Sequence, residues 1–206
     1  MQVDTDIFNS NGKKIAHVDD GHDDKVVILN KSNSAKLKNG EISADQVVSD
    51  KLGQETSCTE LSQSIQALKA TNESEGGLTE FGSVVDKNGD VHQGKSHSAI
   101  VGRKQVVLPE IDGDHNISIH SHITGTYKLG DFTVGDEARP SDDDISVFSN
   151  FKRNLIIGPV NPPESDGNGG TLERSNVIRF YDSRSLNTSS LPARTASKII
   201  RKKSNK

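Results

Sequence analysis

Ile119-His120-Ser121-His122 ends an apolar run that begins at Asn116, and this pattern predicts a β-strand with two histidines at its end. Side chains two residues apart on a strand point to the same face, so both imidazoles can reach one ion while Ser121 faces away. Neutral imidazole is a preferred zinc ligand. The pair therefore predicts a metal site, although an isolated pair of histidines at a strand end is more often simply solvated.

A second motif lies downstream, from Pro140 to Asp144. Serine is favoured at helix N-termini and acidic residues are favoured in the first turn, so Ser141 and the three following aspartates predict the start of a helix. Catalytic zinc commonly keeps three protein ligands and one water, and we expect Asp144 to be the third ligand. The alternative carboxylate ligands are Asp136, Asp142 and Asp143.

An upstream glutamate provides the base that a hydrolytic metal site requires. Glu80 lies within the apolar run from Leu78 to Val85, which predicts a strand. Its carboxylate could take a proton from water and return it to a leaving amine. Glu73 and Glu75 lie close by in the sequence and are the alternatives to Glu80.

The segments around these motifs predict an α/β (α+β) fold in which helices pack on a mixed sheet. Ser57 and Glu60 form an S-x-x-E start signal for a helix that extends to about Ala70. Residues 123–139 contain three glycines and scattered charges, and they predict a long loop. Short apolar runs between turn residues predict further strands at Lys25 to Leu29, Ala99 to Val101, Gln105 to Leu108, Arg153 to Ile157 and Val177 to Tyr181.

The sequence divides into three parts. Residues 1–54 form a strand-rich, polar lead-in, within which Asn30 to Gly53 is expected to be loop or weak helix. Residues 55–185 are expected to form the main domain, with a Gly-, Pro- and Asn-rich loop from Asn161 to Gly170. Residues 186–206 are expected to be a basic, flexible tail, either solvated or in contact with an acidic partner.

Composition narrows the classes of function. The net charge is −4 and the pI is about 6.0, so there is no overall electrostatic reason to expect binding to nucleic acid or to an anionic membrane. Cys58 is the only cysteine, which excludes an internal disulfide and a multi-cysteine zinc site. Residues 1–30 lack a continuous apolar run, and we expect neither a signal peptide nor a transmembrane segment in this chain.

Taken together and in this order, the motifs resemble the E…H-[ST]-H…S-x-x-D signature of the JAMM (MPN-plus) zinc metalloproteases, over about residues 76 to 160. The resemblance implies a central β-sheet packed by helices with cytidine deaminase-like layering. The gap before the S-x-x-D motif is longer than in most family members, so residues 123–139 look like an insertion that gates or selects the substrate. The implied site contains one Zn²⁺ bound by His120, His122 and Asp144, Glu80 as the acid and base, and Ser141 as oxyanion support.

This family includes deubiquitinating isopeptidases and the JAB-like toxin domains of bacterial polymorphic and Rhs-type toxins. The polar lead-in, with Asn11 to Lys14 followed by Asp19 to Gly21, resembles the segment that precedes such toxin domains. The resemblance therefore implies a metallopeptidase or isopeptidase effector, secreted as part of a larger toxin or delivered into a target cell. Its expected partners are a protein or peptide substrate, including a ubiquitin-like or isopeptide-linked one, and a cognate immunity protein.

Two other functions fit the same residues. A catalytically silent MPN-like module would act as a scaffold for protein partners, but such modules usually lack a metal ligand and this chain keeps all of them. A hydrolase of a non-peptide amide is the third option. Asp86 to Asp90 resembles part of a calcium loop, but it lacks the terminal glutamate and is better explained as a hairpin turn.

Overall fold

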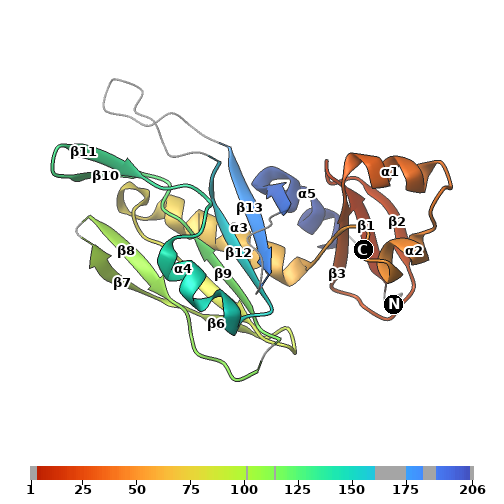
Figure 1. Cartoon of the computed structure of the whole chain (residues 1–206), viewed down its shortest axis with the longest axis horizontal. Helices are drawn as coiled ribbons and strands as arrows, with labels where there is room; N and C mark the ends of the chain where they lie inside the picture. The colour runs from red at the N-terminus through yellow and green to blue at the C-terminus, as the bar shows by residue number, and fades with distance from the viewer. Residues whose placement is uncertain (1–3, 101, 114, 161–174, 183–188, 205–206) are drawn as a thin grey trace. The chain divides into compact units, whose positions relative to one another are not determined.

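The computed structural model describes residues 4–100, 102–113, 115–160, 175–182 and 189–204. The chain forms two compact units, one made of residues 1–62 and 194–206 and the other of residues 63–193. Each contains a sheet with both parallel and antiparallel strand pairs, together with helices (Figure 1). The predicted mixed α+β class is therefore confirmed. The predicted loop from Asn161 to Gly170 lies outside the described residues.

The first unit is built on a four-stranded sheet of order β2-β1-β3-β4, in which only the central pair, β1 and β3, is parallel. Two short helices lie where the sequence predicted a loop or weak helix, and each begins at a capping side chain, Asn30 or Ser43. Ile7, Val27 and Val47 are buried in its core. Its elements are β1 (Thr5–Asn9), β2 (Lys14–Val18), β3 (Lys25–Leu29), α1 (Lys31–Lys38), α2 (Ala44–Ser49), β4 (Gln54–Ser57) and most of α5 (Ala193–Ser204).

Helix α5 corrects the expectation of a flexible C-terminal tail. Thr195, Ala196 and Ile199 are buried at the i, i+1, i+4 spacing of one helix face, while the intervening basic side chains are largely exposed. The ammonium of Lys203 donates to the backbone oxygens of Asp4 and Lys25, at 3.3 and 3.2 Å. The many basic residues of this segment suggested a solvated tail, but its narrow buried face packs the helix within the first unit.

The second unit is built on a six-stranded sheet of order β14-β13-β12-β9-β5-β6, in which β9 and β12 are parallel. Two separate hairpins, β7-β8 and β10-β11, accompany it. Its elements are α3 (Cys58–Glu73, which begins in the first unit), the 3₁₀ turn η1 (Glu75–Gly77), β5 (Gly82–Val85), β6 (Val91–Gln93), β7 (Lys95–Ile100), β8 (Arg103–Val107), β9 (Ile117–Ser121), β10 (Thr126–Leu129), β11 (Phe132–Gly135), α4 (Asp142–Val147), η2 (Phe148–Asn150), β12 (Arg153–Pro159), β13 (Asn176–Asp182) and β14 (Ser189–Pro192).

The two faces of β9 serve different purposes. Ser121 points toward α3, where its hydroxyl lies 2.5 Å from that of Thr71. Since side chains alternate along a strand, His120 points to the opposite face. A parallel pair needs a crossover connection, and the crossover from β9 to β12 brings α4 onto the histidine face, so that α3 and α4 lie on opposite sides of the sheet (Figure 1).

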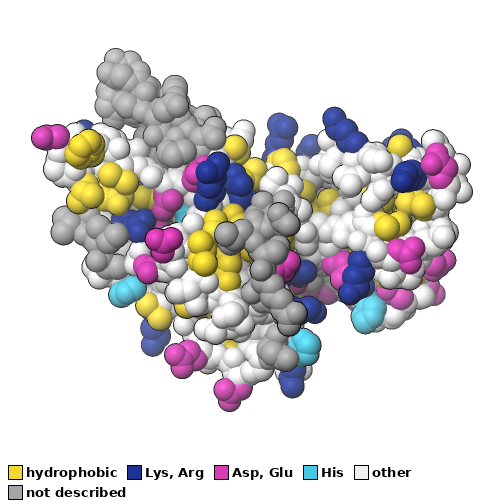
Figure 2. All heavy atoms as spheres, in the orientation of Figure 1, with side chains coloured by type: hydrophobic (Ala, Val, Ile, Leu, Met, Phe, Trp, Pro, Cys, Tyr) yellow, Lys and Arg dark blue, Asp and Glu magenta, His cyan; other side chains and the backbone are white. Residues whose placement is uncertain are grey.

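Two local predictions need correction. The segment 123–139 is not a plain loop, because β10 and β11 pair within it around a turn with Gly130 at a φ of 59°. Leu129 and Phe132 face each other at this turn and are exposed, and hydrophobic side chains gather over the hairpin in Figure 2. Glu80 lies just before β5 rather than inside a strand, although its N–H donates to the Lys104 carbonyl at 2.8 Å.

None of the described helices is both long enough and apolar enough to cross a membrane.

Candidate metal centre

The histidine pair lies where the central strand ends. His120 is in β9, where it pairs with Gly82 of β5 and with Ile156 of β12. His122 is the first residue after the strand. The His122 N–H donates to the Ile157 carbonyl at 2.9 Å, which continues the strand pairing. Both imidazoles are buried, with ring centroids 5.2 Å apart. Backbone pairing on both sides therefore fixes the two rings on one face, as the spacing predicted.

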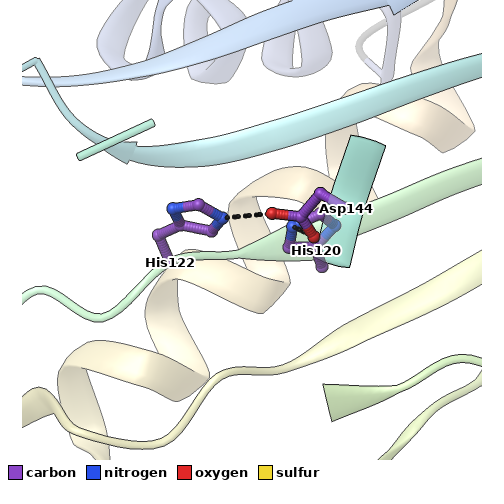
Figure 3. Close-up of side chains that lie close together, drawn as sticks. All are labelled: His120, His122 and Asp144. Atoms are coloured by element: carbon purple, nitrogen blue, oxygen red, sulfur yellow. Dashed lines mark ion pairs between the residues drawn. The ribbon is translucent and has the colours of Figure 1, made fainter. Parts of the chain in front are cut away.

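Asp144 reaches both histidines from α4. One carboxylate oxygen, Oδ1, lies 3.1 Å from His120 Nε2, and the other, Oδ2, lies 3.3 Å from His122 Nε2. Each of the three residues offers one ligand atom, and these atoms all lie within 4.8 Å of one another. Figure 3 shows the three side chains converging. The structure thus brings together the predicted ligand set from a strand end and a helix that are separated by 20 residues of sequence.

The buried nitrogen of His120 supports a shared cation. His120 Nε2 has no hydrogen-bond partner among the described residues, although the Asp144 oxygen is only 3.1 Å away. Ligand atoms bound at 2.0–2.1 Å to one tetrahedral ion lie about 3.3 Å from each other. The two nitrogen–oxygen distances, 3.1 and 3.3 Å, are close to this value but involve different oxygens of Asp144, and the three candidate ligand atoms lie within 4.8 Å of one another. The donor set therefore fits a divalent cation between the three side chains, without selecting zinc over other metals of similar preference.

The second ring nitrogen of His122, Nδ1, is held by the backbone. Nδ1 lies 2.6 Å from the carbonyl oxygen of Glu137, which can only accept, so Nδ1 carries a proton, and Nε2 is the nitrogen that faces Asp144. Metal-binding histidines commonly hold their second nitrogen in this way. Burial by itself lowers the pKa of His122, but Asp136 and Asp144 outweigh it and raise that pKa well above its ordinary value. A cation bound at Nε2 would displace the proton that this nitrogen carries in the charged imidazolium form.

Electrostatics also favour ionised Asp144. Burial would raise the pKa of this carboxyl, but the imidazoles of His120 and His122 outweigh it and hold the pKa well below its usual range. An ionised carboxylate is the form that binds a metal.

Asp136, one of the alternative ligands, lies on the far side of the His122 ring. Its Oδ1 is 3.3 Å from Nδ1, whereas Asp144 is beside Nε2. Arg103 of β8, which sequence reasoning missed, lies 3.2 Å from Asp136 and 3.8 Å from Glu80. A lone arginine in a short strand carries no sequence signal for this role. Asp136 therefore lies on the side of His122 that faces away from the three-residue cluster, where together with Arg103 it can orient the ring.

Glu80 is the buried carboxylate of the site, with 7% of its surface exposed. It lines one cavity of about 430 Å³ together with His120, His122 and Asp144. Burial raises the pKa of Glu80 above its ordinary value, although His122, His120 and Arg103 act in the opposite direction. The alternatives, Glu73 and Glu75, are exposed and do not line this cavity. Of the three glutamates, Glu80 is thus the one placed beside the cluster.

Ser141 is the N-cap of α4, as the sequence indicated. Its hydroxyl donates to Asp144 Oδ2 at 2.7 Å, and its backbone N–H donates to the same oxygen at 2.7 Å. The Asp144 N–H donates back to the Ser141 hydroxyl at 3.2 Å, which completes a capping box. Ser141 therefore holds the carboxylate toward the histidines, and its role as oxyanion donor stays a prediction. Asp142 and Asp143 are exposed and lie outside the three-residue cluster.

The Asp86 side chain binds the backbone of its own turn. Asp86 Oδ1 accepts from the N–H groups of Asn88 and Asp90, at 2.8 and 3.0 Å, and Oδ2 lies 3.2 Å from His92. This arrangement closes the β5-β6 hairpin, as the turn interpretation predicted.

Comparisons with protein family models, curated proteins and solved structures found no match. Local geometry therefore supports the metal centre: a convergent His-His-Asp cluster, a buried imidazole nitrogen without a well-aligned hydrogen bond and a buried glutamate lie in one cavity. Such a constellation, with perturbed pKa values in a concave site, is typical of catalytic centres.

Proposed function

We propose that this chain is a zinc-dependent metallopeptidase or isopeptidase that hydrolyses an amide bond with an activated water molecule. The convergence of His120, His122 and Asp144 beside buried Glu80 carries this proposal. Two imidazoles and one carboxylate form a typical ligand set of catalytic zinc. When bound, the zinc ion would polarise the substrate carbonyl and lower the pKa of water toward ~7.

Glu80 performs the proton transfers in this proposal. A carboxylate with a raised pKa can take a proton from water near neutral pH and deliver it to the leaving amine. Arg103, 3.8 Å from its carboxylate, limits where Glu80 can point. The base is thus held in the same cavity as the predicted ligands.

Ser141 has two roles in the proposal. Its backbone N–H and hydroxyl hold Asp144 before the substrate binds. Because Ser141 also lines the cavity, rotation of its hydroxyl away from Asp144 would let it donate to the oxyanion that forms at the scissile carbonyl. The backbone bond to Asp144 would remain in place during this rotation.

The signature motifs occur in the JAMM order, and the clustered His120, His122 and Asp144 line one cavity together with Glu80 and Ser141. On this basis we extend the proposal to JAMM-like layering of the second unit and to the effector domain of a bacterial polymorphic toxin, delivered as part of a larger protein. Its proposed substrate is a protein or peptide, including a ubiquitin-like or isopeptide-linked one. A cognate immunity protein is the proposed inhibitor.

The test combines metal content with peptide hydrolysis in wild type, Glu80→Gln, His122→Ala and the control His17→Ala, which changes an exposed histidine. We expect one zinc per chain in wild type, Glu80→Gln and His17→Ala, and a loss in His122→Ala. Activity is expected to fall ~10²- to 10⁴-fold in Glu80→Gln. A protein without stoichiometric metal, or a Glu80→Gln variant with full activity, would contradict the proposal. Metal binding and partner binding without hydrolysis would instead indicate the silent scaffold.

A further inference from the structure

The cavity beside the histidines has an apolar wall that the proposed chemistry does not use. Part of this wall comes from β8 and the residues after it, namely Val107, Leu108 and Pro109, and part comes from the end of α4, at Val147 and Phe148. The wall and the ligand cluster line the same cavity. A group held at the cluster would therefore have its neighbouring atoms close to apolar side chains.

Two side chains of this wall are unusually exposed. Val107 has 52% of its surface accessible and Val147 has 42%, although both belong to a concave site where apolar groups can be covered. Binding of an apolar ligand is favourable when it removes exposed apolar surface from water. The wall is thus available to a ligand in the structure as it stands.

The cavity is also larger than the reacting groups need. Its volume of about 430 Å³ lies in the range of small-molecule sites. A scissile amide and one water fill only part of this space. The remainder, bounded by Val107, Leu108 and Val147, fits a large aliphatic or aromatic side chain.

We infer that the substrate carries a large apolar side chain next to the scissile amide, and that this side chain binds against Val107, Leu108 and Val147. The inference rests on the proposed function and narrows its substrate class. Glycine at both positions that flank the amide would leave the apolar wall uncovered.

The charges around the cavity further narrow the class of substrate. Three exposed carboxylates, those of Glu110, Asp112 and Asp143, line it, and acidic side chains gather on the surface around α4 (Figure 2). Arg103 is the only lysine or arginine among the described lining residues, and it is engaged by Asp136 and Glu80. The residues that flank the apolar side chain are therefore neutral or basic, because acidic ones would be repelled.

A matched pair of substitutions isolates the apolar wall. Val147→Trp fills the cavity from α4. Ile145→Trp adds a ring of the same size two residues earlier in the same helix, at a side chain that is also 42% exposed but does not line the cavity. Equal zinc content and equal melting temperatures in the two variants would show that both keep the fold and the ligand cluster.

Ligand-detected NMR with full-length protein tests the wall without hydrolysis, using N-acetyl-leucinamide and N-acetyl-glycinamide as probes. We expect the leucine probe to bind at least ~10-fold more tightly, since a single methylene in an apolar pocket changes recognition by ~10- to 200-fold. Val147→Trp is expected to remove this difference and Ile145→Trp to keep it. Equal binding of the two probes to wild type, or equal losses in the two variants, would overturn the inference.

Hydrolysis of a defined peptide mixture, followed by mass spectrometry of the products, tests the same point in the zinc-loaded protein. We expect Leu, Ile, Met or Phe at one position flanking each cut, and no Asp or Glu beside it. Cuts between glycines, or without side-chain preference, would overturn the inference and leave the proposed peptidase intact. A zinc-loaded protein that cuts no peptide would contradict the proposed function itself, whereas the NMR comparison would still report on the wall.

Discussion

Replacing Asp136 with asparagine is expected to weaken zinc binding by about tenfold, without abolishing it. Asp136 lies 3.3 Å from Nδ1 of His122, the nitrogen that faces away from Asp144, so it orients the ring and does not face the proposed ion. Loss of such an orienting partner typically costs ~10- to 100-fold in metal affinity, or about 1.4–2.7 kcal/mol. The lower end applies here because the Glu137 carbonyl, 2.6 Å from the same nitrogen, still accepts a hydrogen bond from it.

Competition with a chromophoric zinc chelator at fixed pH measures this change. Asp144→Asn, which removes the proposed third ligand, is expected to weaken binding far more than Asp136→Asn. Asp131→Asn changes an exposed aspartate in the turn of the β10-β11 hairpin and serves as the matched control with unchanged affinity. If Asp136→Asn lost stoichiometric zinc while Asp144→Asn kept it, the assignment of ligand and orienting residue would be reversed.

Three further changes probe the surroundings of the site and the first unit. Gly82→Ala places a Cβ about 2.5 Å from the Ile119 carbonyl oxygen and 2.9 Å from His120 Cβ. We expect the free energy of unfolding in urea to fall by ~1–3 kcal/mol and zinc binding to weaken. Unchanged values would contradict this close packing of β5 against β9. Ser141→Ala removes the α4 cap, so the unfolding free energy is expected to drop by ~1 kcal/mol, and an unchanged value would argue against the capping box. Burial, reinforced by nearby Asp24, raises the pKa of Cys58 to about 11, so its alkylation rate is expected to climb about tenfold per pH unit until pH 11, whereas a plateau near pH 9 would refute this burial.

The sequence predicted the parts of the fold that depend on buried apolar runs. The runs that became β3, β9, β12 and β13 are each bounded by turn residues, and a strand of that kind can be recognised without its neighbours. The histidine pair was also predictable, because alternation along β9 alone places both rings on one face. Ser141 could be recognised as a cap from the three acidic residues that follow it.

Other features depend on contacts that no local pattern encodes. The stripe of α5 is small and embedded in basic residues, so the sequence alone suggested a solvated tail. The β10-β11 hairpin exposes Leu129 and Phe132, and it therefore lacks the alternation of a half-buried strand. Arg103 meets Asp136 only because β8 and the crossover segment come together in the fold. Long-range pairing of this kind becomes visible only in the structure.

Anomalous diffraction at the zinc absorption edge, from crystals of protein grown with zinc, would show whether a cation binds the His-His-Asp cluster. We predict a single strong peak about 2.0–2.1 Å from His120 Nε2, from His122 Nε2 and from one carboxylate oxygen of Asp144. A map without a peak among these three side chains, or with its peak at other residues, would contradict the metal centre and the hydrolytic function built on it.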